Sequence, residues 1–312
     1  MIIRIPVAHF VSYNTARYVR TAFRTMGFDA EVITQATYYE DLPEVDLFFA
    51  VDSGGPLNFP EKHRAKTSMW FIDSRHNCNP ARRQPDDDTN AKTLADGGGW
   101  VFQSQKRDWK RNLQTGVIRS GWLPLAADTS VWECRDPEAP TKIYDVGFGG
   151  NVWCIWRREM LDRIRARGWV LGQWTGTPED LAAGYCASRV GFNNSSFFGT
   201  PVAYDVNMRV FEILAMGIPL VSNRLPEMED LGFYPDFHYM PYTDANGAMS
   251  QIRILLSRSE EQRQEMGIRS RSLIMQRHTY LHRMRVALDV LGVVNIINPN
   301  RAAMKGEESG SK

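Results

Sequence analysis

Residues 143–151 read IYDVGFGGN, an alternation of β-forming residues that runs directly into a turn with two glycines. After this turn, apolar residues recur at helical spacing as far as Ile164, and they predict a helix. A further strand is predicted over Trp169–Leu171, beyond a helix-ending Gly168. This succession of strand, helix and strand indicates a βαβ unit with parallel strands.

The same alternation fills the first part of the chain. Strands are predicted over Ile2–Val7, Glu31–Thr34, Leu47–Val51, Met69–Ile72 and Trp100–Phe102. Between the first two, Tyr13–Met26 carries apolar residues at helical spacing and is followed by Gly27. The stretch Asn77–Gly99 contains prolines, successive aspartates and successive glycines, so it is predicted to be a long surface loop.

The second part of the chain repeats the pattern. It is predicted to contain a helix from Pro178, a strand over Val190–Phe192, a helix over Met208–Met216, a strand over Pro219–Val221 and helices over Ala245–Ser257 and Glu260–Val290. A chain of 312 residues exceeds a comfortable single core. The sequence therefore predicts an α/β protein with two Rossmann-like domains, residues 1–135 and 141–297, facing each other across a cleft. Asp136–Pro140 is the expected linker, and residues 298–312 form an expected disordered tail.

Composition limits the classes of partner. Lys and Arg number 37 against 36 Asp and Glu, so no overall positive charge points to nucleic acid. The four cysteines, Cys78, Cys134, Cys154 and Cys186, show neither CxxC spacing nor zinc-ligand spacing and are interpreted as free thiols. No signal peptide and no long apolar run is recognised, so a cytoplasmic location is expected.

Polar residues gather at the entrance of the helix predicted near position 208. Asn207 is a plausible N-cap, and a helix N-terminus suits a phosphate. Arg209 and Glu212, three residues apart on one face, could bind a diphosphate and two ribose hydroxyls, with Asp205 beside them. The alternative is a capped surface helix with an Arg–Glu pair of little energetic weight.

The turn after Phe148 is a second candidate site. Gly149 and Gly150 would let a phosphate approach the backbone, and Arg157 and Arg158 follow on the next helix. A plain strand-to-helix turn with solvated arginines explains the same residues.

A third group of candidates follows predicted strands of the first domain. His9 comes after the first strand, and Asp73 and His76 come after the fourth. Since ligands bind at the carboxyl edge of such sheets, these side chains could remove a proton from an acceptor hydroxyl or hold the acceptor. Structural hydrogen bonding is the alternative for each histidine. The basic segment Lys106–Arg111 is interpreted as a solvated helix face, with phosphate-backbone binding as the alternative.

The motif Asp205-x-Asn207-x-Arg209-x-Phe211-Glu212-x-Leu214-Ala215-x-Gly217 resembles the CgeB-like group of glycosyltransferases. Further segments that resemble this group are Trp70–Asp73, Trp122–Asp128, Asp145–Gly150 and His278–Arg283. The resemblance implies the GT-B fold, a metal-free site, a nucleotide-sugar donor on the second domain and an acceptor on the first. It also implies that Glu212 binds ribose, that Arg209 neutralises the leaving diphosphate, and that the last helix crosses back to the first domain.

The chain departs from the broader group 1 pattern at one position. Eight residues before Glu212, where that pattern has another glutamate, this chain has Tyr204, with Asp205 adjacent. Retention of the anomeric configuration is therefore not implied, and His9 is the favoured base if the enzyme inverts.

The predicted function is transfer of a sugar from a nucleotide diphosphate sugar, with a UDP-sugar favoured, to a hydroxyl of a glycan, a protein, a small molecule or modified DNA. No cofactor is expected. A DNA-modifying transferase acting on hydroxymethylated pyrimidines and a non-catalytic sugar-nucleotide scaffold are the alternatives.

Overall fold

The computed structural model describes residues 1–7, 13–34, 37–38, 40, 42, 44–52, 59–72, 86–134, 142–196 and 205–293. These residues divide into two compact units, each described here by itself. Unit 1 takes its residues from 1–73, 85–124 and the segment after position 279, and unit 2 takes its residues from 125–279. No described helix is long and apolar enough to cross a membrane.

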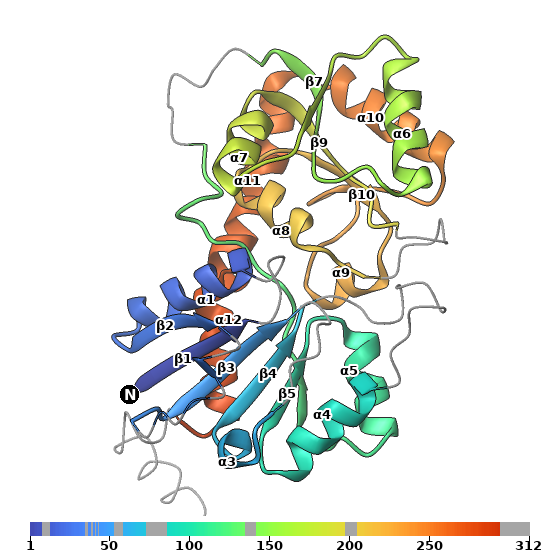
Figure 1. Ribbon diagram of the computed structural model, residues 1–312. Helices are drawn as coiled ribbons and strands as arrows, with labels where there is room; N and C mark the ends of the chain where they lie inside the picture. The colour runs from blue at the N-terminus through green and yellow to red at the C-terminus, as the bar shows by residue number, and fades with distance from the viewer. Residues whose placement is uncertain are drawn as a thin grey trace, which may run out of the picture. The chain divides into compact units, whose positions relative to one another are not determined.

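Unit 1 is built on a six-stranded sheet in the order β2-β1-β3-β4-β5-β6, in which all neighbours are parallel (Figure 1). Its strands are β1 (Ile2–Val7), β2 (Asp29–Thr34), β3 (Leu47–Asp52), β4 (Thr67–Phe71), β5 (Trp100–Gln103) and β6 (Ser120–Trp122). Its helices are α1 (Tyr13–Thr25), α3 (Glu61–Arg64), α4 (Asp86–Asp96), α5 (Lys106–Gln114) and α12 (Tyr280–Val290). Every residue of β4 is buried, as expected for a central strand covered on both faces.

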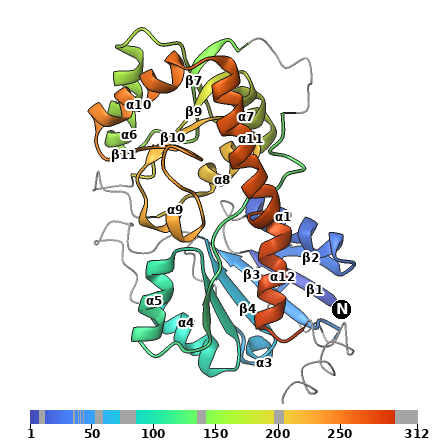
Figure 2. The ribbon, with the colours of Figure 1, turned by 180° about the vertical axis from the view of Figure 1, so that it is seen from behind.

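The helix nearest the C-terminus belongs to this first unit. Figure 2 shows α12 lying beside α1, and the Tyr280 ring packs 5.2 Å from that of Tyr18 and 6.0 Å from that of Trp70. The Arg283 guanidinium donates to the carbonyl oxygen of Pro124 at 2.7 Å. These aromatic and polar contacts hold α12 against the sheet of unit 1, although the helix is far from the sheet in sequence.

Unit 2 has a five-stranded parallel sheet in the order β11-β10-β9-β7-β8. Its strands are β7 (Tyr144–Gly149), β8 (Leu171–Trp174), β9 (Ser188–Asn193), β10 (Leu220–Asn223) and β11 (Met240–Tyr242). Its helices are α6 (Ile155–Arg165), α7 (Pro178–Cys186), α8 (Met208–Ala215), α9 (Pro226–Asp230), α10 (Ala245–Ser257) and α11 (Glu260–Arg277).

The strand order creates a switch point in unit 2. After β7, the chain continues to β8 on one side of it and later to β9 on the other, so the carboxyl ends of β7 and β9 form the switch point, where ligands of open α/β sheets usually bind. Helix α8 packs closely against β9. Gly191 of β9 lies so near Ile213 of α8 that a Cβ at this glycine would clash with the isoleucine side chain. This close packing fixes where the first turn of α8 lies.

The prediction of two Rossmann-like α/β domains is confirmed, and two of the predicted elements differ from the structure as follows. Helix α4 lies inside the predicted loop Asn77–Gly99, because Ala91, Leu94 and Ala95 form a buried stripe that the flanking aspartates and glycines obscured. Strand β8 begins at Leu171, where the prediction ended it, since Trp169 and Val170 had the stronger β propensity but lie before the paired residues. The expected linker lies outside the described residues.

The interpretation of all four cysteines as free thiols is wrong. Cys134 and Cys186 form a disulfide, with Cα atoms 5.6 Å apart and a sequence separation of 52. Cys154 is buried, and Cys78 lies outside the described residues. Spacing patterns identify local metal or redox motifs, whereas this pair is brought together only by the tertiary fold.

Candidate functional site

The turn after β7 contains Gly149 and Gly150, which the sequence analysis named as a candidate phosphate site. Gly150 has a φ of 121°, and a Cβ there would clash with the Arg209 guanidinium, so only glycine allows this approach. The Gly149 amide donates to the Tyr185 hydroxyl at 2.7 Å, and the Gly150 amide donates to the Trp174 carbonyl at 2.8 Å. The turn therefore serves the site by admitting Arg209 and not by presenting these two amides to a ligand.

Arg209 projects from the first turn of α8 toward this glycine turn. Its guanidinium lies 5.0 Å from the centroid of the Phe148 ring, and Nη1 donates to the Asn193 side-chain oxygen at 3.3 Å. Asn207 occupies the N-cap position, but its side chain makes no cap hydrogen bond and instead donates to that same Asn193 oxygen at 3.0 Å. The amide of Asn207 thus helps to fix the turn that carries Arg209.

Glu212 lies one turn further along α8 and is only 8% exposed. Burial raises the pKa of its carboxyl to about 8, and the nearby Arg209 partly opposes this shift. No hydrogen bond or ion pair occupies its oxygens in the described part of the chain. A carboxyl in this state can receive hydroxyl groups of a ligand, and their hydrogen bonds would favour its charged form.

Arg157 brings a second guanidinium from α6. It donates to the carbonyl oxygens of Asn151 at 2.5 Å, Asn194 at 3.2 Å and Ser196 at 3.3 Å. Its guanidinium carbon lies 5.8 Å from the Phe148 centroid. Burial, and then Arg209, lower its pKa to about 10, so it stays charged near neutral pH. Two cations therefore adjoin one aromatic ring at the carboxyl ends of β7 and β9.

The structure brings together most of the donor-site residues expected from the sequence. Gly149, Gly150, Arg157, Asn207, Arg209 and Glu212 all lie at this edge of unit 2, and Asp205 is buried just before α8. His9, Asp73 and His76 lie outside the described residues. The sequence reasoning missed Asn193 and Tyr185. A polar residue that ends a strongly apolar strand was the available signal for Asn193, whereas Tyr185 resembled any core aromatic.

The basic segment Lys106–Arg111 forms most of α5 in unit 1. Lys106 lies 5.2 Å from the Trp122 ring, and among its four basic residues only Lys110 is exposed. The predicted solvated basic face is therefore only partly exposed.

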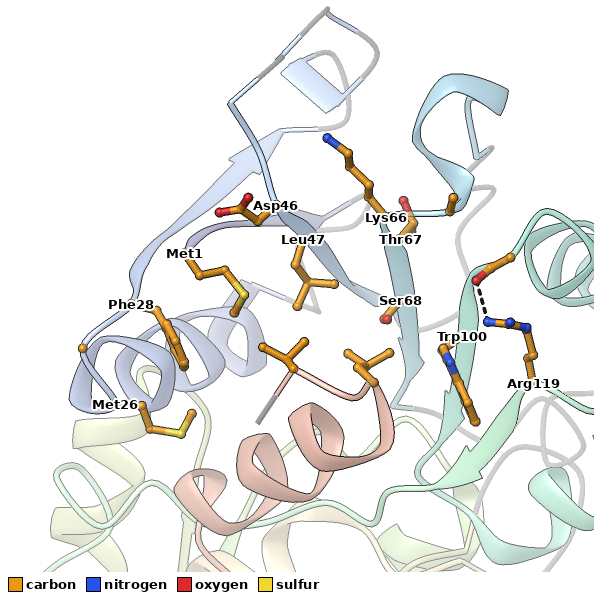
Figure 3. A pocket seen from close by; sticks show the side chains of 15 residues that line it. Met1, Met26, Phe28, Asp46, Leu47, Lys66, Thr67, Ser68, Trp100 and Arg119 are labelled. Atoms are coloured by element: carbon orange, nitrogen blue, oxygen red, sulfur yellow. Dashed lines mark hydrogen bonds between the residues drawn. The ribbon is translucent and has the colours of Figure 1, made fainter. Parts of the chain in front are cut away.

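A cavity of about 800 Å³ lies at the amino ends of the unit 1 strands, the edge opposite to that where ligands usually bind (Figure 3). Its polar groups are already engaged by the protein. Lys66 donates to the Val45 carbonyl at 3.0 Å, Arg119 donates to the Gly98 carbonyl at 2.9 Å, and Asp46 accepts the Ile2 amide at 2.7 Å.

Comparisons with known proteins bear on the family and the fold. A family model described as "Glycosyl transferase-like" matches residues 143–289. No protein with a curated function matches the chain in sequence. Sucrose-phosphate synthase from Thermosynechococcus elongatus is similar in structure, with a TM-score of 0.63 at 10% identity over 97% of this chain and 100% of that one.

Two further solved structures are similar at the same level of identity. Alr3699/HepE from Anabaena, in complex with UDP-glucose, has a TM-score of 0.63 at 10% identity over 94% of this chain and 100% of its own. An alpha-glucosyltransferase, in complex with UDP and a DNA containing an HMU base, has a TM-score of 0.65 at 10% identity over 94% of this chain and 99% of its own. The family match shows a glycosyl transferase-like segment over residues 143–289, and the solved structures show that the chain shares the two Rossmann-like domains of the GT-B fold.

Proposed function

We propose that the protein transfers a sugar from a UDP-sugar, bound at the carboxyl edge of the unit 2 sheet, to an acceptor hydroxyl. The observation that carries this proposal is the convergence of Arg157, Arg209 and Glu212 at the switch point between β7 and β9. The complexes of HepE with UDP-glucose and of the alpha-glucosyltransferase with UDP support the choice of uridine.

Each of these side chains suits one part of a nucleotide sugar. Arg209 offers a guanidinium that can donate to the negatively charged diphosphate, and Arg157, whose terminal nitrogens donate to main-chain carbonyls, adds positive charge beside it. Glu212 is buried, its oxygens have no partner among the described residues, and it suits the paired hydroxyls of the ribose. The first turn of α8 adds the positive end of a helix dipole beside the phosphate.

In the transfer, the bond between the anomeric carbon and the β-phosphate oxygen breaks, and a bond between that carbon and the acceptor oxygen forms. The products are the glycoside, UDP and the proton released by the acceptor hydroxyl. Negative charge grows on the leaving diphosphate, so fixed guanidinium groups stabilise the transition state more than the ground state. Arg209 is therefore expected to affect turnover as well as binding.

The acceptor side of the proposal rests on unit 1. We propose that His9 is the base that receives the acceptor proton, and that Asp73 and His76 hold the acceptor, because all three follow carboxyl ends of strands. The chain is further proposed to belong to the CgeB-like group, on the motif from Asp205 to Gly217.

The proposal is tested by titrating UDP, GDP, ADP and TDP, and then the corresponding sugar nucleotides, into the wild-type protein and Glu212→Ala by calorimetry. We expect UDP to bind selectively and Glu212→Ala to weaken it about tenfold or more, because a hydrogen bond to a charged group is lost. Glu179→Ala is the matched control, since Glu179 is exposed in the first turn of α7. Failure of every diphosphate to bind, or equal loss in the control, would contradict the proposal.

A further inference from the structure

Asn193 lies at the centre of the proposed donor site without belonging to the residues that face the donor. It is the last residue of β9, at the switch point, and its exposed fraction is 0%. In the sheet it pairs with Ser222 of β10, and its carbonyl oxygen accepts the Tyr242 hydroxyl at 2.9 Å. A polar side chain so deeply buried requires a full set of hydrogen-bonding partners.

The side chain of Asn193 has that full set. Its amide nitrogen donates to the hydroxyls of Ser195 at 3.0 Å and Ser222 at 2.9 Å. Its amide oxygen accepts from Asn207 at 3.0 Å and from Arg209 at 3.3 Å. One side chain thus joins two neighbouring strand ends to the first turn of α8.

The direction of these bonds is fixed chemically. A guanidinium can only donate, so the atom of Asn193 that faces Arg209 must be its oxygen. The opposite orientation would place an amide nitrogen against Arg209 and lose that hydrogen bond. The two serine hydroxyls can turn to accept or donate, and they adapt to the orientation that Arg209 imposes.

The uncharged state of Asn193 matters as much as its position. An aspartate here would offer the same shape and the same acceptor to Arg209, but its charge would be buried against the guanidinium and would offset the positive charge meant for a diphosphate. An asparagine orients the arginine and leaves its charge available.

We propose that Asn193 is a positioning residue for the diphosphate of the donor, which holds Arg209 and Asn207 in place through one neutral amide oxygen. This inference rests on the proposed function, since it assigns Arg209 to the diphosphate. It predicts that Asn193 acts on phosphate recognition through Arg209 and leaves recognition of the nucleoside unchanged.

Asn223 provides a matched control. It is the last residue of the neighbouring strand β10, is 8% exposed, and accepts the Ser195 amide with its side-chain oxygen at 2.7 Å. Its side chain is a buried strand-end amide like that of Asn193, but its hydrogen bond goes to the main chain and not to Arg209. Loss of a buried amide alone should therefore cost both variants stability, while only Asn193 variants should lose phosphate recognition.

The experiment measures affinity for UDP and for uridine by calorimetry in the wild type, Asn193→Ala, Asn193→Asp, Asn223→Ala, Arg209→Ala and the double variant Asn193→Ala/Arg209→Ala. We expect both Asn193 variants to bind UDP about tenfold more weakly and uridine within about twofold of the wild type. In the Arg209→Ala background, Asn193→Ala should change UDP affinity by less than about twofold, because its effect passes through Arg209.

Unchanged UDP affinity in both Asn193 variants would overturn the inference, as would an equal loss for uridine or an equal loss in Asn223→Ala. Asn193→Asp keeps the side-chain shape, and the hydroxyls of Ser195 and Ser222 can donate to it, so the test survives if the alanine variant does not fold. If the wild type does not bind UDP, the proposed function fails. If the wild type binds UDP and Arg209→Ala weakens it while Asn193 variants do not, only the positioning role fails.

Turnover gives a second readout for the aspartate variant. Because charge builds up on the leaving diphosphate, Asn193→Asp should lower kcat at saturating donor as well as raise KM. A change in KM alone would contradict a role in orienting Arg209 during transfer.

Discussion

The carboxyl edge of unit 2 and the amino edge of unit 1 differ in how their polar groups are used. The unit 1 edge has a cavity of about 800 Å³, and Lys66, Arg119 and Asp46 in its lining are hydrogen-bonded to the main chain. At the unit 2 edge, Arg209 and Glu212 are fixed by packing and one amide network, and the oxygens of Glu212 have no partner in the described part of the chain.

The comparison teaches that hollow space does not by itself indicate a functional site. A binding site requires converging side chains, some of which keep hydrogen-bonding groups available for a ligand. A parallel sheet supplies such side chains where strands end and helices begin. Substitutions at the two edges should therefore differ in their effect on UDP binding.

Arg209→Ala should lower UDP affinity roughly 100-fold, because the diphosphate loses the charge-assisted hydrogen bonds of this guanidinium and keeps only the charge of Arg157 nearby. Calorimetric titration measures the loss. Arg158→Ala is the control, since Arg158 is an exposed arginine next to Arg157 on α6. Equal weakening in both variants would mean that general positive charge, and not the placement of Arg209, attracts the nucleotide.

Gly150→Ala should lower UDP affinity about tenfold, because the new Cβ displaces the Arg209 guanidinium. Gly168→Ala is a close control, since Gly168 also has a positive φ, 76°, but no atom lies within 4 Å of its added Cβ. Both variants should melt at lower temperature, and only Gly150→Ala should lose affinity. Retained affinity in Gly150→Ala would show that the close approach of Arg209 is not needed.

Glu212 should make the stability of the protein depend on pH. Burial raises its pKa from 4.5 to about 8, so between these values the folded chain keeps a proton that the unfolded chain has released. Stability contributed by this group is therefore lost as the pH rises through this window. The melting temperature of Glu212→Gln, compared with that of the wild type, should therefore rise as the pH increases from about 5 to about 9.

The same shift predicts a proton released when UDP binds near pH 7, because hydrogen bonds from ribose favour the charged carboxyl. Calorimetry in buffers of different ionisation enthalpy detects it. Glu179→Gln, which changes an exposed glutamate, should behave as the wild type in both measurements. Proton release that persists in Glu212→Gln would assign it to another group.

Lys66→Ala tests the amino edge of the unit 1 sheet and should change UDP affinity less than the substitutions at the unit 2 edge. Loss of its hydrogen bond to the Val45 carbonyl should reduce stability by about 1 kcal/mol, while UDP affinity should stay within about twofold of the wild type. Thermal unfolding and the same titration measure both quantities. A clear loss of UDP affinity would mean that the amino edge takes part in donor binding.

Much of the fold could be predicted because its signals are local. Strand β1 and helix α10 have the predicted bounds, and Gly217, with a φ of 70°, follows α8 as expected. Helix α4 was missed because its short buried stripe lies between sequences typical of loops. The disulfide between Cys134 and Cys186 was missed because its partners have a sequence separation of 52.

Local sequence patterns predicted two sets of parallel strands with crossover helices, and they placed Arg209 and Glu212 on one helix face. The hydrophobic period, the turn-forming residues and the three-residue spacing of Arg209 and Glu212 are all properties of residues close in sequence. They can therefore be recognised without knowing the fold. Only the tertiary structure decided that Gly150 admits Arg209, that Asn193 orients it, and that Glu212 is buried enough to hold its proton. These properties depend on segments far apart in sequence, because close contacts and desolvation arise only when the sheet brings their ends together.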